Sequence, residues 1–482
     1  TRYRAALARG ADPVPVDRRL RILLAGVGDV RGVISLLRAA VPPDVISDPE
    51  NELRGAWDEL FRRAAALSER TASTPEGPVE DLADALVRVG AVDEAAALLE
   101  PLASARARAT RDACRREVRF EQALRRVVEE GYRAPAEGRD PPSLASLLGS
   151  IRELAREHLD PTSARAFDAP AVGMRSMPLL GEWLDHAVRT TSPVVAHFRR
   201  FGKYALVGQV AGKAPEVIVL SLASLAPGAT VRTQGRVLRH DVAIGYDRGV
   251  RSYVDFQGGS LSGAALPDGV WLDADASRRE DHALRAALSI DPSLGRELDR
   301  AAADPSPPDG IEGVLSTDET QLLALRLARR YFARVGADPW GSFHVLRAHE
   351  YGHVLDLERH LPVAGGLPAT LALVASAGFA FDRVEARLEG RAQLAAVRDG
   401  RDPDLALIDL VRSVPSAERA PEAHEWGYRA VVEAMVRRLW LARDAHPAVD
   451  STRKLLPQLD RLTPEEIRRL GDDVARAGFT VR

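Results

Sequence analysis

The stretch Phe343-His-Val-Leu-Arg-Ala-His349-Glu350-Tyr-Gly-His353-Val-Leu-Asp-Leu357 contains the pattern His-Glu-x-x-His. Apolar residues surround this pattern and no proline interrupts it, so the sequence predicts one helix over residues 343–359. Residues four apart on a helix lie one above the other, about 6 Å along the axis, so both imidazoles can reach one cation. Two of the four tetrahedral positions around a zinc ion would then be filled.

Glu350 lies one step round the predicted helix from His349, at the edge of the same face. A carboxylate at this place can take a proton from a zinc-activated water, whose pKa the metal lowers to about 7. We therefore expect Glu350 to be a general base. The residues resemble the zincin superfamily of zinc metallopeptidases, in which the two histidines bind zinc and the intervening Glu is catalytic. The resemblance implies one zinc ion per chain and a peptide or protein substrate.

A third zinc ligand is needed, and neighbouring histidines are poorly placed to supply it. If the helix simply continues, His360 lies about 10 Å beyond His353, against a zinc to nitrogen bond of about 2 Å. His344 lies about 140° round the helix from His349. We therefore expect both to be surface or packing residues.

Two acids follow on a second predicted helix, in Phe381-Asp-Arg-Val-Glu385-Ala-Arg-Leu-Glu389. Glu385 and Glu389 share one helical face. Their Glu-Ala-x-x-Glu arrangement is similar to the second motif of the zincins with a Glu ligand (gluzincins), which implies Glu385 as zinc ligand and Glu389 as the acid that orients a ligating histidine. The reverse assignment stays open, because Glu389-Gly-Arg-Ala also resembles a ligand motif of related peptidases. Without zinc, the pair would be a solvated acidic stripe.

Further downstream, His424 and Tyr428 lie four residues apart on one face of a predicted helix. Many metallopeptidases use a His or Tyr from a later segment to donate a hydrogen bond to the oxyanion of the tetrahedral intermediate. We expect this catalytic role for the pair. The alternative is that the two rings only pack into the domain.

Composition excludes some classes of partner. The 482 residues carry 66 basic and 69 acidic side chains, so nothing points to nucleic acid or to an anionic membrane. Arginine and alanine dominate, which indicates a GC-rich bacterial genome. The uncharged segment 361–381 is long enough to suggest a membrane span, but a span would hold the two halves of the zinc site about 30 Å apart. We expect a soluble protein, either cytoplasmic or exported with a signal segment missing from this chain.

The sequence predicts an α+β fold that is predominantly helical. Residues 1–190 read as a helical N-terminal region, in which 85–101 resembles a tetratricopeptide hairpin that could contact a protein partner. Residues 195–450 would form a zincin-like catalytic domain, with a small sheet over 195–275 and the third-ligand helix over 369–398. One strand, expected after residue 240, would pair with an extended substrate. Residues 451–482 would form a C-terminal helical tail.

These observations predict a zinc metallopeptidase that hydrolyses peptide bonds through a zinc-activated water, with Glu350 as general base. Two alternatives stay open. The chain could be a catalytically silent scaffold or binding protein with a zincin fold, although such a site has no need of Glu350. It could also be a zinc hydrolase that acts on a non-peptide amide.

Overall fold

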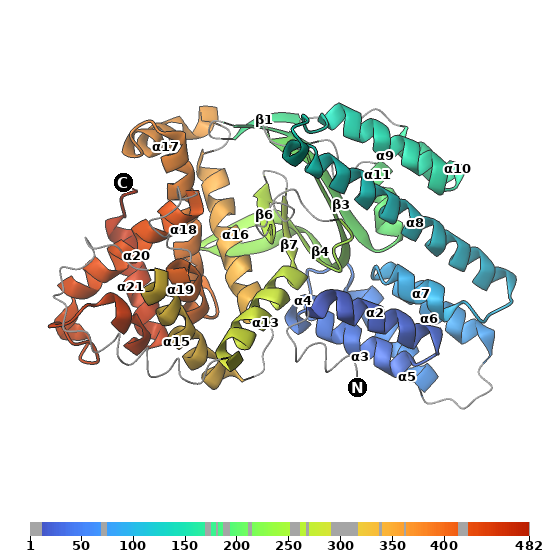
Figure 1. The fold of residues 1–482 in the computed structure, drawn as a ribbon, viewed down its shortest axis with the longest axis horizontal. Helices are drawn as coiled ribbons and strands as arrows, with labels where there is room; N and C mark the ends of the chain where they lie inside the picture. The colour runs from blue at the N-terminus through green and yellow to red at the C-terminus, as the bar shows by residue number, and fades with distance from the viewer. Residues whose placement is uncertain are drawn as a thin grey trace. The chain divides into compact units, whose positions relative to one another are not determined.

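The fold is mainly helical with one sheet, which confirms the expected α+β class. Two compact units are formed: one by Thr1–Pro227, Asp241–Ser262 and Trp271–Ala276, the other by Gly228–His240, Gly263–Val270 and Ser277–Arg482. The computed structural model describes residues 12–68, 75–168, 175–179, 182–186, 193–210, 215–250, 261–266, 269–290, 317–336, 340–360, 363–412 and 423–481 (Figure 1).

The first unit contains the helices that the sequence predicts for the N-terminal region. The predicted tetratricopeptide-like segment forms a hairpin of α6 and α7, joined at Gly90 (φ 83°). The bounds of the helices are α2 Pro13–Gly26, α3 Val30–Ala40, α4 Pro43–Ser47, α5 Arg54–Ser68, α6 Glu76–Arg88, α7 Val92–Leu98, α8 Ala105–Arg133, α9 Leu144–His158, α10 Pro161–Ala164 and α11 Pro193–Arg200.

The strands follow the order β1-β2-β3-β4-β5-β7-β6 in one sheet. The pairs β1–β2, β2–β3 and β3–β4 are antiparallel, with Tyr204 of β3 opposite Leu220 of β4. A two-residue turn at Gln234 and Gly235, both with positive φ, connects β4 to β5. The bounds are β1 Arg175–Leu179, β2 Glu182–His186, β3 Lys203–Val210, β4 Glu216–Thr233, β5 Arg236–Tyr246, β6 Gly263–Leu266 and β7 Gly269–Asp273.

The sheet departs from the expected boundaries in two ways. Strands begin at 175, inside the region expected to be helical, and most of the sheet packs with the N-terminal helices rather than with the motif helix. Trp57 of α5, which is fully buried, donates its indole N–H to the carbonyl of Ala223 in β4 at 2.9 Å. Asn51 donates to the same carbonyl at 3.2 Å. Residues 251–260, inside the segment 195–275 that was expected to form the sheet, lie outside the described residues.

The second unit is a bundle of helices that includes the motif helix, α16. The helix expected over 369–398 is two helices, α17 and α18, because the chain turns through Gly378 (φ 67°) and Phe379 (φ 60°). In the described part of the chain, no helix is both long and apolar enough to cross a membrane. The bounds are α13 Ala274–Ile290, α15 Thr317–Val335, α16 Gly341–His360, α17 Val363–Ser376, α18 Phe381–Asp399, α19 Pro403–Arg412, α20 Ala423–Leu441 and α21 Pro464–Ala477.

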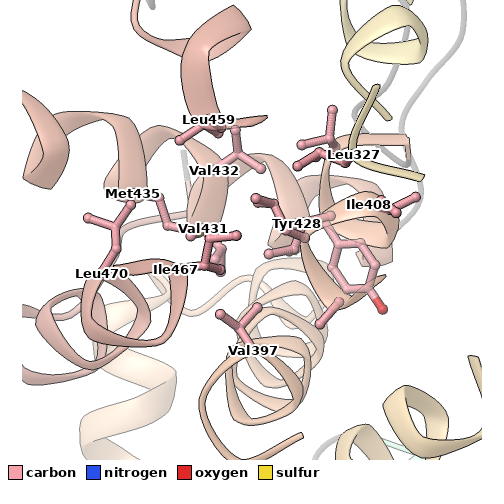
Figure 2. Close-up of a cluster of buried hydrophobic side chains, with 14 of the residues drawn as sticks. Leu327, Val397, Ile408, Tyr428, Val431, Val432, Met435, Leu459, Ile467 and Leu470 are labelled. Carbon is pink, nitrogen blue, oxygen red and sulfur yellow. The ribbon is translucent and has the colours of Figure 1, made fainter. Parts of the chain in front are cut away.

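An apolar core holds this bundle together. Figure 2 shows Val397 of α18, Val431 and Met435 of α20 and Ile467 of α21 converging in it. Residues 451–482, expected to be a tail, contribute Ile467 and other fully buried side chains, so they belong to the core. The core fixes α18 and α20 against each other, and these helices carry the candidate site residues.

Candidate metal centre

The two histidines of the motif point the same ring nitrogen at one place. His349 and His353 lie one turn apart on α16, and their Nε2 atoms are 3.0 Å apart. His349 is buried and His353 is partly buried. The four-residue spacing therefore acts as the sequence predicts and brings both Nε2 atoms to one place.

Helix α18 approaches α16 closely at the motif because the motif contains a glycine. A Cβ added to Gly352 would lie 2.8 Å from Cα of Ala392 and 3.0 Å from Cβ of Ala395. Any larger residue at 352 would push the helices apart. This close packing places the Oε2 atom of Glu389 at 3.4 Å from Nε2 of His349 and at 3.5 Å from Nε2 of His353.

The acid beside the histidines is Glu389, whereas the first choice from sequence was Glu385. Among the described residues, the cluster able to hold a metal consists of His349, His353 and Glu389, and the side chain of Glu385 is exposed. Both acids lie on one face of α18, one turn apart. The point at which α18 crosses α16 decides between them, and the contact at Gly352 selects the second acid.

The spacing of the three ligand atoms fits a tetrahedral metal ion. Zinc to nitrogen and zinc to oxygen bonds of about 2.0–2.2 Å correspond to ligand atoms separated by roughly 3.3–3.6 Å. The separations of 3.4 and 3.5 Å fall in this range, and that of 3.0 Å between the imidazoles is slightly shorter. The Oε2 atom of Glu389 is buried, and the ring nitrogens of His349, His353 and His424 lie 3.2–3.5 Å from it. The cluster therefore suits a divalent cation with one position left for another ligand.

The electrostatics of the cluster also favour a cation. Burial would lower the pKa of His353, but the Glu389 carboxylate outweighs burial and raises this pKa to about 9. Burial would raise the pKa of Glu389, but the charge of His353 holds it well below its usual range. The carboxylate thus retains a positive partner at neutral pH. A metal ion would take the place of the proton on His353.

Gln393 orients His349, a role that the sequence analysis did not assign. Its Oε1 atom lies 2.8 Å from Nδ1 of His349, and its Nε2 donates to the carbonyl of Ala406 at 3.0 Å. The second contact fixes which end of the amide faces the imidazole. Nδ1 of His349 then donates to this oxygen, which turns Nε2 toward the cluster. The sequence offered one signal for Gln393: it follows Glu389 by four residues, which places it one turn along the same face of α18.

Glu350 is buried beside the cluster. The backbone N–H of Ala265, in β6, donates a hydrogen bond to its carboxylate. Burial raises the pKa of Glu350, whereas the charges of His349 and His353 oppose the rise. A carboxylate with a raised pKa can hold a proton between two steps of a reaction. Strand β6 lies inside the segment 195–275 that was expected to form a small sheet.

His424 and Tyr428 both reach the cluster, but in different ways. Nε2 of His424 lies 3.2 Å from Oε2 of Glu389, and the His424 side chain is about half exposed, at 55%. Tyr428 is buried, and its hydroxyl donates to Oε1 of Gln393 at 3.3 Å. Figure 2 shows this hydroxyl pointing away from the apolar core. The exposed His424 side chain can therefore contact a bound ligand, whereas the Tyr428 hydroxyl holds the Gln393 side chain in place through a hydrogen bond.

His424 and Tyr428 lie beside the cluster because α20 packs closely on α18 at Gly427. A Cβ added to Gly427 would lie 2.0 Å from the carbonyl oxygen of Ala386 and 2.9 Å from the backbone nitrogen of Gly390. The backbones of α18 and α20 therefore nearly touch beside Glu389. Gly427 lies between His424 and Tyr428, so this contact sets the position of both.

The remaining motif-helix histidines lie outside the cluster, as expected. Nδ1 of His344 lies 3.1 Å from a guanidinium nitrogen of Arg347. His360 is buried, with Nδ1 at 3.4 Å from the hydroxyl of Thr370. Neither residue belongs to the metal-binding group found among the described residues.

Comparisons of the chain with protein-family models, with curated proteins and with solved structures found no match.

Proposed function

We propose that this chain is a zinc-dependent metallopeptidase of the zincin type. The observation that carries the proposal is the convergence of Nε2 of His349, Nε2 of His353 and Oε2 of Glu389 from two separate helices. Two imidazoles and one carboxylate, with a fourth position open, are a ligand set typical of catalytic zinc. A closed structural site would use four protein ligands.

Bound zinc would polarise a substrate carbonyl and lower the pKa of a water molecule to about 7. Glu350 would accept the proton of the attacking water and return it to the leaving amine. Its buried position and the hydrogen bond from Ala265 hold the carboxylate in place between these steps. His424, exposed beside Glu389, would donate a hydrogen bond to the developing oxyanion.

Strand β6 supplies a place for the substrate. It packs on α16, its Ala265 contacts Glu350, and it is the last of the described strands in the sheet order. An extended peptide that pairs with this strand would have its backbone fixed beside the zinc ligands. Edge pairing is sequence-independent, so it supports hydrolysis of peptides rather than of one small amide.

Metal removal tests the proposal. Zinc per chain is measured by mass spectrometry after dialysis, and hydrolysis is measured on a mixed peptide library with and without 1,10-phenanthroline. We expect one zinc ion per chain, and hydrolysis that the chelator abolishes and stoichiometric zinc restores. If the zinc-loaded chain cleaves no peptide, it is a scaffold or acts on a non-peptide amide. If hydrolysis continues at the same rate in the presence of the chelator, the metal takes no part in the reaction.

Substitution of Gln393 tests how His349 is held. We expect Gln393→Leu to weaken zinc affinity by about 10- to 100-fold, because it removes the acceptor that fixes the His349 tautomer. Tyr428→Phe removes the other hydrogen bond to the same oxygen and should change zinc affinity by less than about threefold. Competition with a chromophoric chelator measures both affinities. Equal affinities for the wild type and Gln393→Leu would show that the amide does not support the ligand.

A further inference from the structure

A basic pocket lies on the face of α18 that points away from the metal cluster. Its volume is about 430 Å³, and five arginines line it: Arg359 of α16, Arg387, Arg391 and Arg398 of α18, and Arg476 of α21. Arg391 is about 200° round α18 from Glu389, so the pocket and the cluster use opposite faces of the helix. The function proposed above does not use the pocket.

Carboxylates balance only part of this charge. Arg391 pairs with Asp356 at 2.5 Å, Arg398 pairs with Asp472 at 2.7 Å, and Arg476 pairs with its neighbour Asp473. Among the described residues, no carboxylate forms an ion pair within 4 Å of Arg359 or Arg387, although the charge of Arg359 also acts on Asp356. No aspartate or glutamate is among the described residues that line the pocket. Two positive charges are thus left over in one concave site.

The surplus charge acts on a neighbouring group. Burial, together with the charges of Arg391 and Arg359, lowers the pKa of His360 to about 4. The histidine therefore stays neutral and adds no further charge at neutral pH. Arginines that face one another without counterions repel, so an anion that enters the pocket gains both the attraction and the relief of this repulsion.

The pocket walls indicate what kind of anion fits. Guanidinium groups bind phosphate through two parallel hydrogen bonds. Leu394, Val474 and Phe479 provide an apolar wall beside them. The volume is typical of pockets for small molecules. A long polyanion is disfavoured because the chain has a net charge of −3, which provides no general attraction for nucleic acid.

We propose that this pocket binds a small phosphorylated molecule with at least two negative phosphate charges, held by Arg359, Arg387 and Arg391 and covered on one side by Phe479. The ligand binds whether or not the metal cluster is filled, because the two sites occupy opposite faces of α18. Its binding stabilises the packing of α16, α18 and α21, which all contribute to the pocket.

Calorimetric titration with inorganic pyrophosphate at low salt tests the proposal. Neutral 1,10-phenanthroline is present, so that the anion cannot bind a metal. We expect the wild type to bind pyrophosphate with Kd below about 1 mM. The double variant Arg359→Gln/Arg387→Gln should bind at least about tenfold more weakly, whereas the control Arg329→Gln, an exposed arginine of α15, should bind as the wild type does.

Thermal unfolding provides the second measurement. Pyrophosphate should raise Tm of the wild type and leave Tm of the double variant unchanged. Without pyrophosphate, the double variant should be at least as stable as the wild type, because it loses two repelling charges. If it does not fold, the single variant Arg359→Gln, at an exposed position, replaces it and should still weaken binding at least about threefold.

Three results would overturn the proposal. The wild type could fail to bind pyrophosphate, the variants could bind it as tightly as the wild type, or a single-stranded oligonucleotide could bind more tightly than pyrophosphate does. The variant Glu389→Gln should retain pyrophosphate binding. Failure of the metallopeptidase proposal would therefore leave this result unchanged.

Discussion

The substitution Glu350→Gln should lower peptide hydrolysis by about a thousandfold while zinc stays bound at one ion per chain. Glutamine has the shape of glutamate and can still accept the hydrogen bond from Ala265, but it cannot take up a proton. The zinc ligands are unchanged by this substitution. Turnover of the best library peptide and zinc content, both measured on the same preparation, give the result.

The matched control is Glu358→Gln, which removes an exposed carboxylate two turns further along the same helix. Its turnover should equal that of the wild type. If Glu350→Gln hydrolyses peptides at the wild-type rate, Glu350 is not the base, and the mechanism proposed for this site is wrong. If the substitution removes zinc as well as activity, the carboxylate has a structural role.

The substitution Glu389→Gln should weaken zinc binding by more than about 100-fold, beyond the loss expected for a residue that only supports a ligand. An amide oxygen carries no charge, and the negative charge of Glu389 is what balances the cation. The variant should also lower the pKa of His353, because burial then acts without the opposing carboxylate. Chelator competition measures the affinity, and NMR titration of the imidazole follows the pKa.

Glu385→Gln is the matched partner of this experiment, since it changes the same residue type one turn away on the same helix. Its zinc affinity should stay within about threefold of the wild type, because the side chain is exposed and lies outside the cluster. If Glu385→Gln loses zinc and Glu389→Gln does not, the assignment from sequence was right and the packing of α16 on α18 differs in solution.

Local patterns predicted the elements of the site well. The spacing of His349 and His353 on a helix free of proline fixed both ring positions, since helical geometry alone relates residues four apart. The second helix and its acidic pair were also expected. The α+β class followed from the helical region expected over 1–190 and from the small sheet expected over 195–275.

The choice between Glu385 and Glu389 could not be made from sequence, because it depends on where two helices cross. Gly352 and Gly427 set these crossings by allowing backbones to approach. A glycine inside a predicted helix indicates in the sequence that another backbone can approach there. The sequence does not indicate which helix makes this approach. Gln393 was missed for a related reason: the gluzincin pattern led us to expect an acid in its role.

The sheet was predicted less well. Strand β6 has the sequence Gly263-Ala-Ala-Leu266, without a β-branched residue, so its propensity does not indicate a strand. The domain boundaries also differed, because Trp57 and Asn51 anchor the sheet to N-terminal helices. Such contacts between distant segments leave no periodic signal in the sequence.

Anomalous diffraction at the zinc absorption edge, from crystals grown with stoichiometric zinc, tests the proposed zinc site. This site requires one strong peak, within about 2.0–2.2 Å of Nε2 of His349, Nε2 of His353 and a carboxylate oxygen of Glu389. A peak bound elsewhere, or the absence of any peak among these three side chains, would contradict it.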